Sequence, residues 1–370
     1  MLALIDALSD RCTFSVLLPE CSGFLTDELK KRGIKVYYAP LYRWTCEKNS
    51  KALAKKVCWS VSWKRKNEKL LLRLIEEMKD EKFDLVHSNT SVINYGERLS
   101  QLLGVPHLWH IREFGEKDFN IVPLGSYKEY FDTFSGSNGI ICCISKGVYE
   151  KFKPELPENK IYIVYDGVGK NNIIPDRQYK KEGTLIIVQA GNINRFKGQQ
   201  YGIEAVQELY RRGITDVKLL IAGRGELSRL GLDISNLHNV EMLGVVDDMP
   251  GLRAKEDVEI VASRCEAFGL VTAEAMMGGV PVVGSDSGAT AEIIDDNENG
   301  LLFSPGNSKD LADKLEYLYN NRGEIERFGR KAAEKAQSMY TAEKNSEGIW
   351  QLYCRLSSTS FSKSDTMENL

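Results

Sequence analysis

Long apolar runs are missing from this chain of 370 residues, and none of its hydrophobic stretches approaches the roughly 20 residues that cross a bilayer as a helix. The start of the chain, Met1 to Leu8, lacks the basic segment and the long apolar core of a secretory signal. With 42% hydrophobic and 27% charged residues, the composition is that of a soluble globular protein. We therefore expect a cytoplasmic protein.

An excess of one charge is also missing, because 49 Lys and Arg residues face 52 Asp and Glu residues and leave a net charge of -3. A nucleic-acid partner is not expected, since such partners require a basic surface. Eight cysteines are present without any C-x-x-C pair, and four histidines form no cluster with metal-ligand spacing. Reduced, buried thiols are the expected state, and neither a disulfide framework nor a metal site is predicted.

Short apolar segments alternate with helical segments along most of the chain, which predicts the α/β class with parallel sheets covered by helices. In the first half, strands are expected at 14–18, 34–38, 83–87, 106–111, 139–144 and 161–165. In the second half, strands are expected at 184–190, 217–222, 240–243, 257–262 and 280–283. The sequence therefore predicts two α/β domains in succession.

The domain boundaries follow from a polar run between Asp166 and Gly183, which interrupts this alternation and is typical of a linker. A Ser- and Thr-rich tail closes the chain, and such composition predicts disorder. The expected parts are a first domain at 1–168, a second domain at 183–340, a helix at 341–356 and a disordered tail at 357–370.

The stretch 265–284 predicts a loop, a helix that begins near Gly269, and a buried strand. Glu266 lies just before the helix, where backbone N–H groups have no intrahelical partners and the helix dipole favours anions. Glu274 lies in the helix, beside an apolar face where an unpaired carboxylate is costly. This face is expected at Leu270, Ala273 and Met277. A nucleotide sugar fits this pattern as a ligand, because its phosphates can bind at the helix start and its hydroxyls can bind to the two carboxylates. The alternative is an ordinary α/β unit without a ligand, in which one Glu caps the helix and the other is solvated.

A second loop with glycine at both ends, 191–198, follows an expected strand and opens the next helix. Gly191 and Gly198 free the backbone of this loop. Arg195 and Lys197 can reach a diphosphate that binds at the start of the helix. A solvated basic loop would have the same composition, and both interpretations stay open at this point.

Two features of the first half carry functional hypotheses. His110 ends an expected strand, and ligands of parallel sheets bind beyond the carboxyl ends of strands. A packed histidine at a strand end is the alternative.

The segment 51–69 surrounds Trp59 and Trp63 with basic residues, a pattern that suits an anionic membrane surface. A solvated helix with buried indoles fits the segment equally well. The basic residues are Lys51, Lys55, Lys56, Lys64, Arg65, Lys66 and Lys69, against the single acid Glu68.

The chain resembles the family-4 retaining glycosyltransferases. The resemblance lies in the phrases Glu266-Ala267-Phe268-Gly269-Leu270, Glu274-Ala275-Met276 and Gly279-Val280-Pro281-Val282-Val283, followed by Gly288 and Glu292-Ile293-Ile294. It implies the GT-B fold, in which two Rossmann-like domains face each other and the last helix, here Ala342 to Arg355, crosses back to the first domain. It also implies transfer from a nucleotide diphosphate sugar to a hydroxyl of a glycan or lipid-linked glycan, in surface-polysaccharide synthesis. Many such enzymes bind the inner face of the cell membrane peripherally, which favours the membrane interpretation of 51–69.

The resemblance also implies the roles of single residues. Family enzymes carry an arginine where this chain has Asn192, and we expect Arg195 to supply that charge from nearby. The resemblance implies no separate base, because an oxygen of the leaving phosphate receives the proton of the acceptor. No metal ion is expected, because no Asp-x-Asp motif stands in the expected place. The residues expected to be catalytic are Glu266, His110 and Lys197. The residues expected to bind the donor are Gly191, Asn192, Arg195, Lys197, Phe268, Gly269, Leu270 and Glu274.

The first ten residues depart from the family pattern. They predict an amphipathic helix with no strand before it, whereas a Rossmann-like domain opens with a strand and a glycine-rich turn. We therefore expect an incomplete first domain. Two alternatives to the transferase remain: a non-catalytic remnant that binds nucleotide sugars, and a sugar-nucleotide epimerase of GT-B fold. The nucleotide base, the donor sugar and the acceptor are not predicted.

Overall fold

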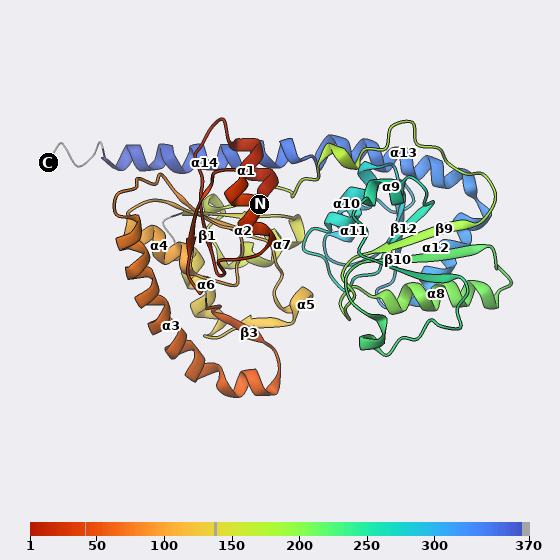
Figure 1. The fold of residues 1–370 in the computed structure, drawn as a ribbon, viewed down its shortest axis with the longest axis horizontal. Helices are drawn as coiled ribbons and strands as arrows, with labels where there is room; N and C mark the ends of the chain where they lie inside the picture. The colour runs from red at the N-terminus through yellow and green to blue at the C-terminus, as the bar shows by residue number, and fades with distance from the viewer. Residues whose placement is uncertain (41, 137–138, 365–370) are drawn as a thin grey trace. The chain divides into compact units, whose positions relative to one another are not determined.

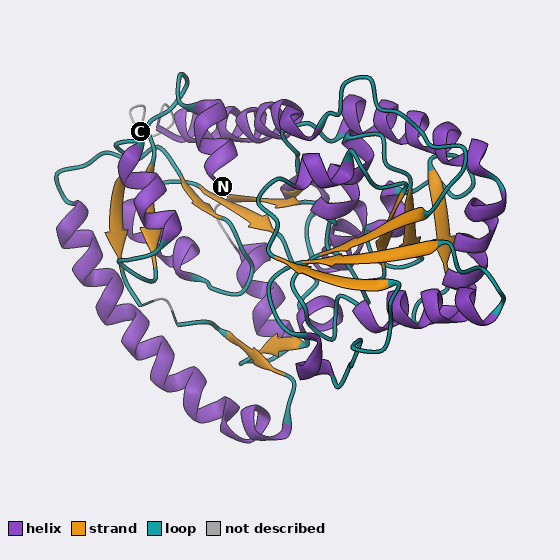
Figure 2. Ribbon diagram, turned by 45° about the vertical axis from the view of Figure 1, so that its right-hand side comes forward, coloured by secondary structure: helices purple, strands orange, loops and turns teal. Residues whose placement is uncertain are grey.

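The computed structural model describes residues 1–40, 42–136 and 139–364, and it describes no side chains for 50–60 and 358–364. The chain divides into two compact units. Unit 1 comprises Met1–Val164 and Asn345–Leu370, and unit 2 comprises Tyr165–Lys344. Each unit combines parallel sheets with helices (Figures 1 and 2), as predicted for the α/β class.

Unit 2 contains a six-stranded parallel sheet in the order β11-β10-β9-β12-β13-β14. Its strands are β9 Leu185–Ala190, β10 Val217–Ala222, β11 Val240–Gly244, β12 Val258–Val261, β13 Val282–Ser285 and β14 Gly300–Phe303. The chain runs from β9 outward through β10 to β11, and then crosses to β12 on the other side of β9. The strand order therefore reverses between β9 and β12. In open α/β sheets, ligands bind beyond the carboxyl ends of the strands at such a reversal.

Helices cover both faces of this sheet, and Figure 1 shows α8 and α12 on the side opposite α10 and α13. The helices of unit 2 are α8 Gln199–Arg211, α9 Met249–Arg253, α10 Leu270–Met277, α11 Thr290–Ile293, α12 Ser308–Asn320 and α13 Arg322–Met339. Apolar residues from the strands, such as Ile187, Leu219 and Ile260, pack with Val206 of α8 and Leu315 of α12. Full burial of each such side chain contributes about 1.5–3 kcal/mol, so this core holds the strand ends in place.

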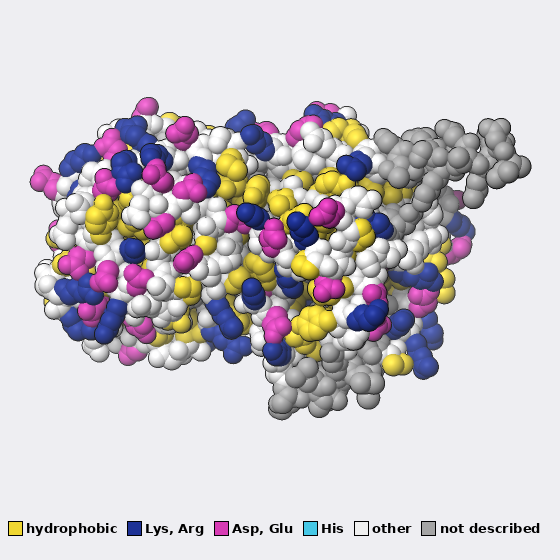
Figure 3. All heavy atoms as spheres, turned by 180° about the vertical axis from the view of Figure 1, so that it is seen from behind, with side chains coloured by type: hydrophobic (Ala, Val, Ile, Leu, Met, Phe, Trp, Pro, Cys, Tyr) yellow, Lys and Arg dark blue, Asp and Glu magenta, His cyan; other side chains and the backbone are white. Residues whose placement is uncertain are grey.

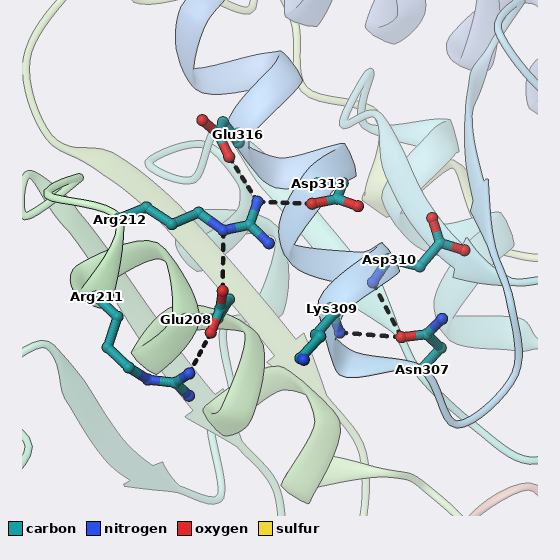
Figure 4. A network of polar contacts seen from close by, with 8 residues as sticks. All are labelled: Glu208, Arg211, Arg212, Asn307, Lys309, Asp310, Asp313 and Glu316. Atoms are coloured by element: carbon teal, nitrogen blue, oxygen red, sulfur yellow. Dashed lines mark hydrogen bonds and ion pairs between the residues drawn. The ribbon is translucent and has the colours of Figure 1, made fainter.

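An ion-pair network joins the neighbouring helices α8 and α12 at the surface (Figure 4). Arg212, which ends α8, lies 2.6 Å from both Asp313 and Glu316 of α12 and 3.1 Å from Glu208 of α8. Asn307 caps α12 by accepting hydrogen bonds from two backbone N–H groups of its first turn. An isolated exposed ion pair contributes at most about 1 kcal/mol, but one arginine shared by three carboxylates orders both helices.

Unit 1 divides its strands between two parallel sheets, a pair β1-β2 and a four-stranded sheet in the order β4-β5-β7-β8. These strands are β1 Ser15–Leu18, β2 Lys35–Tyr38, β4 Val86–Ser88, β5 His107–Ile111, β7 Gly139–Cys143 and β8 Ile161–Ile163. The antiparallel pair of β3 Thr45–Glu47 with β6 Ile121–Pro123 is not predicted from the sequence, because three residues carry too little pattern. The helices are α1 Leu2–Leu8, α2 Phe24–Lys31, α3 Ser50–Met78, α4 Tyr95–Leu103, α5 Glu116–Phe119, α6 Tyr127–Gly136, α7 Lys146–Phe152 and α14 Ala342–Ser364.

The helix predicted at the start of the chain is present as α1, and it contacts both sheets of unit 1. Leu8 packs with Leu108 of β5, whereas Ile5 packs with Leu18 of β1. Within the described residues, no strand pairs with the second edge of β1 or of β4. These two strands are accordingly half-buried, while β5 and β7 are buried along their whole length.

The last helix, α14, belongs to unit 1 from Asn345 onward. Its buried residues Ile349, Tyr353 and Leu356 join the core around β5 and β7. The helix begins where expected but continues to Ser364, into the segment 357–370 that was expected to be disordered. No Pro or Gly stands between Ser357 and Ser364 to end it. Residues 365–370 lie outside the described residues.

Among the helices that the structure describes, none combines the length and the apolar character needed to cross a membrane. Acidic and basic side chains are interspersed over the face of the molecule drawn in Figure 3. This mixture agrees with the near-balance of charges in the sequence.

Candidate functional site

The two loops that carry the predicted site of unit 2 meet at the carboxyl ends of β9 and β12, where the strand order reverses. Nζ of Lys197 lies 2.6 Å from Oε1 of Glu266, although 69 positions separate them in the sequence. The Lys197 side chain is 32% exposed and that of Glu266 is 16% exposed, so both are reachable from solvent. Lys197 and Glu266, which were expected to act on the same ligand, thus form an ion pair where the strand order reverses.

The loop 191–198 is held firmly against the end of β12. Gly198 has a φ of 67°, and a Cβ at this position would lie 2.1 Å from the carbonyl oxygen of Ala262. Gln189, which is buried in β9, donates from Nε2 to the carbonyl of Gly198 at 3.2 Å. Gln199 donates from Nε2 to the carbonyl of Asn192 at 3.2 Å. Lys197 therefore extends from a backbone whose position the sheet determines.

The backbone around Glu266 is fixed from two sides. The N–H of Arg264 donates to the carbonyl of Phe196 at 2.8 Å, which ties this loop to 191–198. The N–H of Ala289 donates to the carbonyl of Glu266 at 2.8 Å. Gly288 packs so closely that a Cβ would lie 2.5 Å from the same carbonyl oxygen. A glycine at 288 is required because the turn after β13 touches the Glu266 backbone directly.

Helix α10 presents its amino end at the same place. It follows Gly269, whose φ is 89°, and among the described residues no side chain caps it. The first backbone N–H groups of a helix have no intrahelical partners, and the helix dipole favours an anion beside them. Ala273 and Met277 are buried as predicted, but the expectation that Leu270 faces the core is wrong, because this side chain is 43% exposed. Leu270 is the first residue of α10, and helical periodicity does not determine burial at the end of a helix.

The remaining residues expected to bind the donor differ in exposure. Asn192 and Arg195 are exposed, and the guanidinium of Arg195 lies 5.0 Å from the ring centre of Phe196. Phe268 is only 2% exposed and packs against Tyr165 and Tyr340. Its side chain is therefore part of the core, and only its backbone is available to a ligand.

Glu274 has the buried partner that its position demanded. Nη1 of Arg253 donates to Oε2 of Glu274 at 3.1 Å, and Nε of Arg253 donates to Oε2 of Glu259 at 2.9 Å. Arg253 is 1% exposed and Glu259 is fully buried, whereas the Glu274 side chain is 32% exposed. Burial raises the pKa of Glu259, and the neighbouring guanidinium opposes that rise. Glu274 is thus held by a buried arginine while its carboxylate remains accessible.

Arg253 and Glu259 were not identified from the sequence, although a signal was present. Glu259 interrupts the otherwise apolar strand Val258–Val261, and a charge inside a buried strand requires a counter-charge. The identity of that counter-charge depends on the fold, because several basic residues precede the strand.

His110 lies in unit 1, in β5, and is 1% exposed. Its Nδ1 lies 3.2 Å from Nε2 of His87 in the neighbouring strand β4, and Nδ1 of His87 lies 2.6 Å from Oη of Tyr353 in α14. Burial lowers the pKa of both imidazoles, that of His87 to about 3, so both rings are neutral near pH 7. Nε2 of His110 is buried without a hydrogen-bond partner among the described residues.

A Ser-His-Glu arrangement in unit 1 has the connectivity of a hydrolase triad. Nε2 of His107 lies 2.9 Å from Oγ of Ser88, and Nδ1 of His107 lies 2.9 Å from Oε2 of Glu97. All three side chains are buried. A Cβ on Gly96 would lie 1.9 Å from the Ser88 hydroxyl, so α4 itself occupies the space that a substrate would need. The arrangement fastens α4 to β4 and β5 and is not a hydrolytic site.

The basic segment 51–69 forms part of α3. Trp63 is half-buried and packs against Tyr42 and against the cluster of Cys46, Val122 and Leu124, so its indole is a packing residue. Trp59 and the basic residues at 51–56 lie outside the described side chains. The three consecutive basic residues Lys64, Arg65 and Lys66 are exposed. No group of three or more His, Cys, Asp or Glu side chains within the described part of the chain is arranged to hold a metal ion.

The fold defines a class. Two α/β units with parallel sheets and helices are the architecture of GT-B proteins, and solved structures of that fold align over nearly the whole chain. The structure of Alr3699/HepE from Anabaena, solved with UDP and glucose, aligns with a TM-score of 0.71 and 19% identity over 95% of this chain and 94% of that chain. The predicted GT-B fold is therefore confirmed.

Sequence comparison finds a family model that matches most of unit 2. Residues 171–335, which include Lys197, Glu266 and Glu274, match the family model described as glycosyl transferases group 1. Uncharacterized glycosyltransferase MJ1178 of Methanocaldococcus jannaschii is 27% identical over 288 residues, 76% of this chain and 78% of that protein. D-inositol 3-phosphate glycosyltransferase of Pseudarthrobacter chlorophenolicus is 35% identical over 168 residues, 42% of this chain and 39% of that protein. Both of these relatives are glycosyltransferases by their names.

Proposed function

We propose that this chain is a retaining glycosyltransferase that moves a sugar from a nucleotide diphosphate sugar to a hydroxyl of a glycan or lipid-linked glycan. The observation that carries the proposal is the ion pair of Lys197 with Glu266 beside the uncapped start of α10. A cation and free N–H groups suit a diphosphate, and a carboxylate next to them suits the sugar that the diphosphate carries. The similarity of 171–335 to glycosyl transferases group 1 supports the same conclusion.

The rate acceleration in this proposal comes from positive charge placed where the leaving diphosphate develops negative charge. Lys197, Arg195 and the N–H groups near Gly269 and Leu270 supply that charge. Preorganised groups of this kind usually give the largest share of catalysis. An ammonium has three donors, so Lys197 can keep its bond to Glu266 while it binds a phosphate oxygen. No metal ion has a role in this mechanism.

The carboxylates act on the sugars. Glu266 binds hydroxyls of the donor sugar and stabilises the positive charge that its ring develops as the glycosidic bond breaks. Glu274, anchored by Arg253, binds the hydroxyls of the ribose. An oxygen of the leaving phosphate takes the proton of the acceptor hydroxyl, so no separate base is assigned. His110 donates a hydrogen bond to the donor sugar.

The acceptor and the place of action extend the proposal. A protein similar to part of this chain acts, by its name, on D-inositol 3-phosphate, a phosphorylated polyol. The exposed residues Lys64, Arg65 and Lys66 suit an anionic lipid surface or the phosphate of a lipid-linked acceptor. We infer that the enzyme works on the inner face of the cell membrane, in synthesis of a surface polysaccharide.

A thermal-shift screen of nucleotide sugars tests the proposal, with UDP-glucose among them because Alr3699/HepE binds it. A ligand at 100 times its dissociation constant stabilises the native state by about 2.7 kcal/mol, which is easily detected. Transfer to a hydroxyl acceptor, with the anomeric configuration of the product determined by NMR, is the expected second result. Stabilisation without transfer would support the non-catalytic remnant, and a free epimerised nucleotide sugar would support the epimerase. Inverted configuration would contradict the retaining mechanism.

A further inference from the structure

Three ring side chains of unit 1 form a chain of hydrogen bonds that ends in an unpaired atom. Oη of Tyr353 lies 2.6 Å from Nδ1 of His87, and Nε2 of His87 lies 3.2 Å from Nδ1 of His110. Nε2 of His110 is the last polar atom of the chain, and it is buried without a partner among the described residues. The three residues come from α14, β4 and β5.

The protons of this chain can be arranged in two ways. In the first, Tyr353 donates to Nδ1 of His87, and Nε2–H of His87 donates to Nδ1 of His110, which places the proton of His110 on Nε2. In the second, Nδ1–H of His110 donates to His87, and Nδ1–H of His87 donates to the oxygen of Tyr353. A neutral imidazole has one donor and one acceptor nitrogen, so no third arrangement keeps both bonds.

Counting unsatisfied groups selects the first arrangement. In the first, Oη–H of Tyr353 and Nε2–H of His87 both have acceptors, and one buried donor is left over, Nε2–H of His110. In the second, the phenol proton of Tyr353 points away from His87, and Nε2 of His110 becomes a buried acceptor without a donor. Each arrangement leaves one donor that needs a further partner, at a cost of about 1–3 kcal/mol when none is present, but the second leaves an unpaired acceptor as well. Tyr353 is 6% exposed, and burial raises the pKa of its phenol, so it is present as the donor form.

We propose that Tyr353 and His87 are positioning residues that hold His110 with its proton on Nε2, so that this N–H is a ready donor to an oxygen of the sugar substrate. The proposal rests on the proposed function for the identity of the acceptor oxygen, but not for the tautomer. Without the two partners, the ring of His110 exchanges between two tautomers, and only one of them can donate from Nε2. When the tautomer is fixed, every molecule has its donor on Nε2 before the substrate binds.

The tautomers are measured directly by nitrogen-15 NMR of the ligand-free full-length protein, labelled at histidine. The expected result is Nε2–H for both His87 and His110. In Tyr353→Phe, His87 loses the donor to its Nδ1, and we expect both rings to show a mixture. Tyr95→Phe is the matched control, because Tyr95 is also a buried phenol of unit 1 and donates to Asn67 at 2.9 Å, away from the histidines. Nδ1–H at His110 in the unchanged protein, or tautomers that Tyr353→Phe leaves as they are, would overturn the proposal.

A pair of substitutions at His87 separates the tautomer from simple packing. His87→Gln keeps an amide N–H that can donate to Nδ1 of His110, whereas His87→Leu offers no donor. We expect His110 to stay Nε2–H in the Gln variant and to become mixed in the Leu variant. If the two variants change His110 equally, His87 acts only by filling space and the proposal fails.

The functional part uses the nucleotide sugar that stabilises the protein most in the thermal-shift screen. We expect Tyr353→Phe and His87→Leu to lower kcat/KM about tenfold, which is the low end of the effect of losing a partner that orients a histidine. The kcat/KM values of Tyr95→Phe and His87→Gln should stay close to that of the unchanged protein. Equal kcat/KM in all four variants would overturn the role in substrate binding. If no nucleotide sugar binds at all, the proposed function fails, and the NMR result still decides whether Tyr353 and His87 set the tautomer.

Discussion

Lys197 and Glu266 form an ion pair of 2.6 Å at the reversal point of the unit 2 sheet, with loops from two adjacent strands supplying one partner each. The two charges suit the two regions of a sugar diphosphate: the ammonium suits the anionic phosphates, and the carboxylate suits the electron-poor anomeric carbon. In the proposed function the ammonium donates to a phosphate oxygen while it keeps its bond to Glu266, and the negative charge of Glu266 opposes binding of the diphosphate. The two residues therefore affect binding and catalysis in opposite directions, and substitutions can separate the effects.

Glu266→Gln keeps the shape of the side chain and removes its charge. Turnover should fall by roughly 100-fold or more, the scale of a lost electrostatic contact to a transition state. Affinity for the nucleoside diphosphate should not weaken, because the substitution releases Lys197 from its partner and removes a negative charge beside the phosphates. Steady-state kinetics and titration calorimetry measure the two quantities. Near-normal turnover would remove Glu266 from the mechanism.

Lys197→Ala should instead weaken binding of the nucleoside diphosphate by about 1–3 kcal/mol, the range for hydrogen bonds to charged groups. Lys309→Ala is the matched control, because Lys309 is an exposed lysine of unit 2 at the start of α12 (Figure 4). Calorimetry should show unchanged affinity in the control. The same affinity in both variants would show that the loop 191–198 does not bind phosphate.

Substitutions at Arg253 test whether it positions Glu274. Arg253→Met leaves Glu259 buried without its partner, and breaking a buried ion pair costs about 3–5 kcal/mol of unfolding free energy. In the double variant Arg253→Met with Glu259→Met both charges are gone, so most of the stability should return. Glu274 still lacks its anchor, and the preference for a ribonucleoside diphosphate over the 2′-deoxy form should remain reduced. A double variant that discriminates as well as the unchanged protein would show that Arg253 serves stability alone.

The basic surface of α3 gives a prediction about lipids. If Lys64, Arg65 and Lys66 face an anionic membrane, the protein should sediment with anionic vesicles and not with neutral ones. Binding should weaken as salt is added, since the field of a charged surface decays over about 10 Å at 0.1 M ionic strength. Replacing the three residues by Glu should abolish sedimentation and leave the thermal shift with nucleotide sugar unchanged. Equal sedimentation of the unchanged protein and the variant would show that the three residues face solvent and do not bind lipid.

The sequence predicted the parts of the site that follow from strand ends. Lys197 and Glu266 both follow expected strands, and carboxyl ends of parallel strands lie at one edge of a sheet, so their meeting is a consequence of the fold class. Contacts between residues that depend on side-chain packing could not be predicted from the sequence. Arg253 was not connected with Glu274, and Tyr353 lies 266 positions from the histidine that it contacts.

One error of prediction has a local cause. Leu270 has helical spacing to buried residues, but it is the first residue of α10, and periodicity does not report how far neighbouring elements cover the end of a helix. The disorder expected for 357–370 from its Ser and Thr content stays a prediction, because the structure describes α14 as far as Ser364 and no side chains from 358 onward.

The buried histidines predict how stability depends on pH. The pKa of His87 is lowered to about 3 by burial, with smaller effects from the like charges of His107 and Arg112, against an ordinary value of 6.5. Below pH 6.5 the unfolded chain binds a proton at this residue and the native state does not, so the unfolding free energy falls as the pH decreases from 6.5 toward 3. His110 contributes in the same direction, because burial lowers its pKa as well. Each such group has a limiting slope of about 1.4 kcal/mol per pH unit.

Denaturation with urea at several pH values between 7 and 4 measures this slope, and His87→Gln removes one titrating group without adding a charge. Carboxylates contribute equally to the unchanged protein and to the variant, so the difference between the two curves isolates the histidine. The decline should be shallower in the variant by up to about 1.4 kcal/mol per pH unit. Identical slopes would mean that His87 takes up a proton in the native state, which contradicts a neutral ring between Tyr353 and His110.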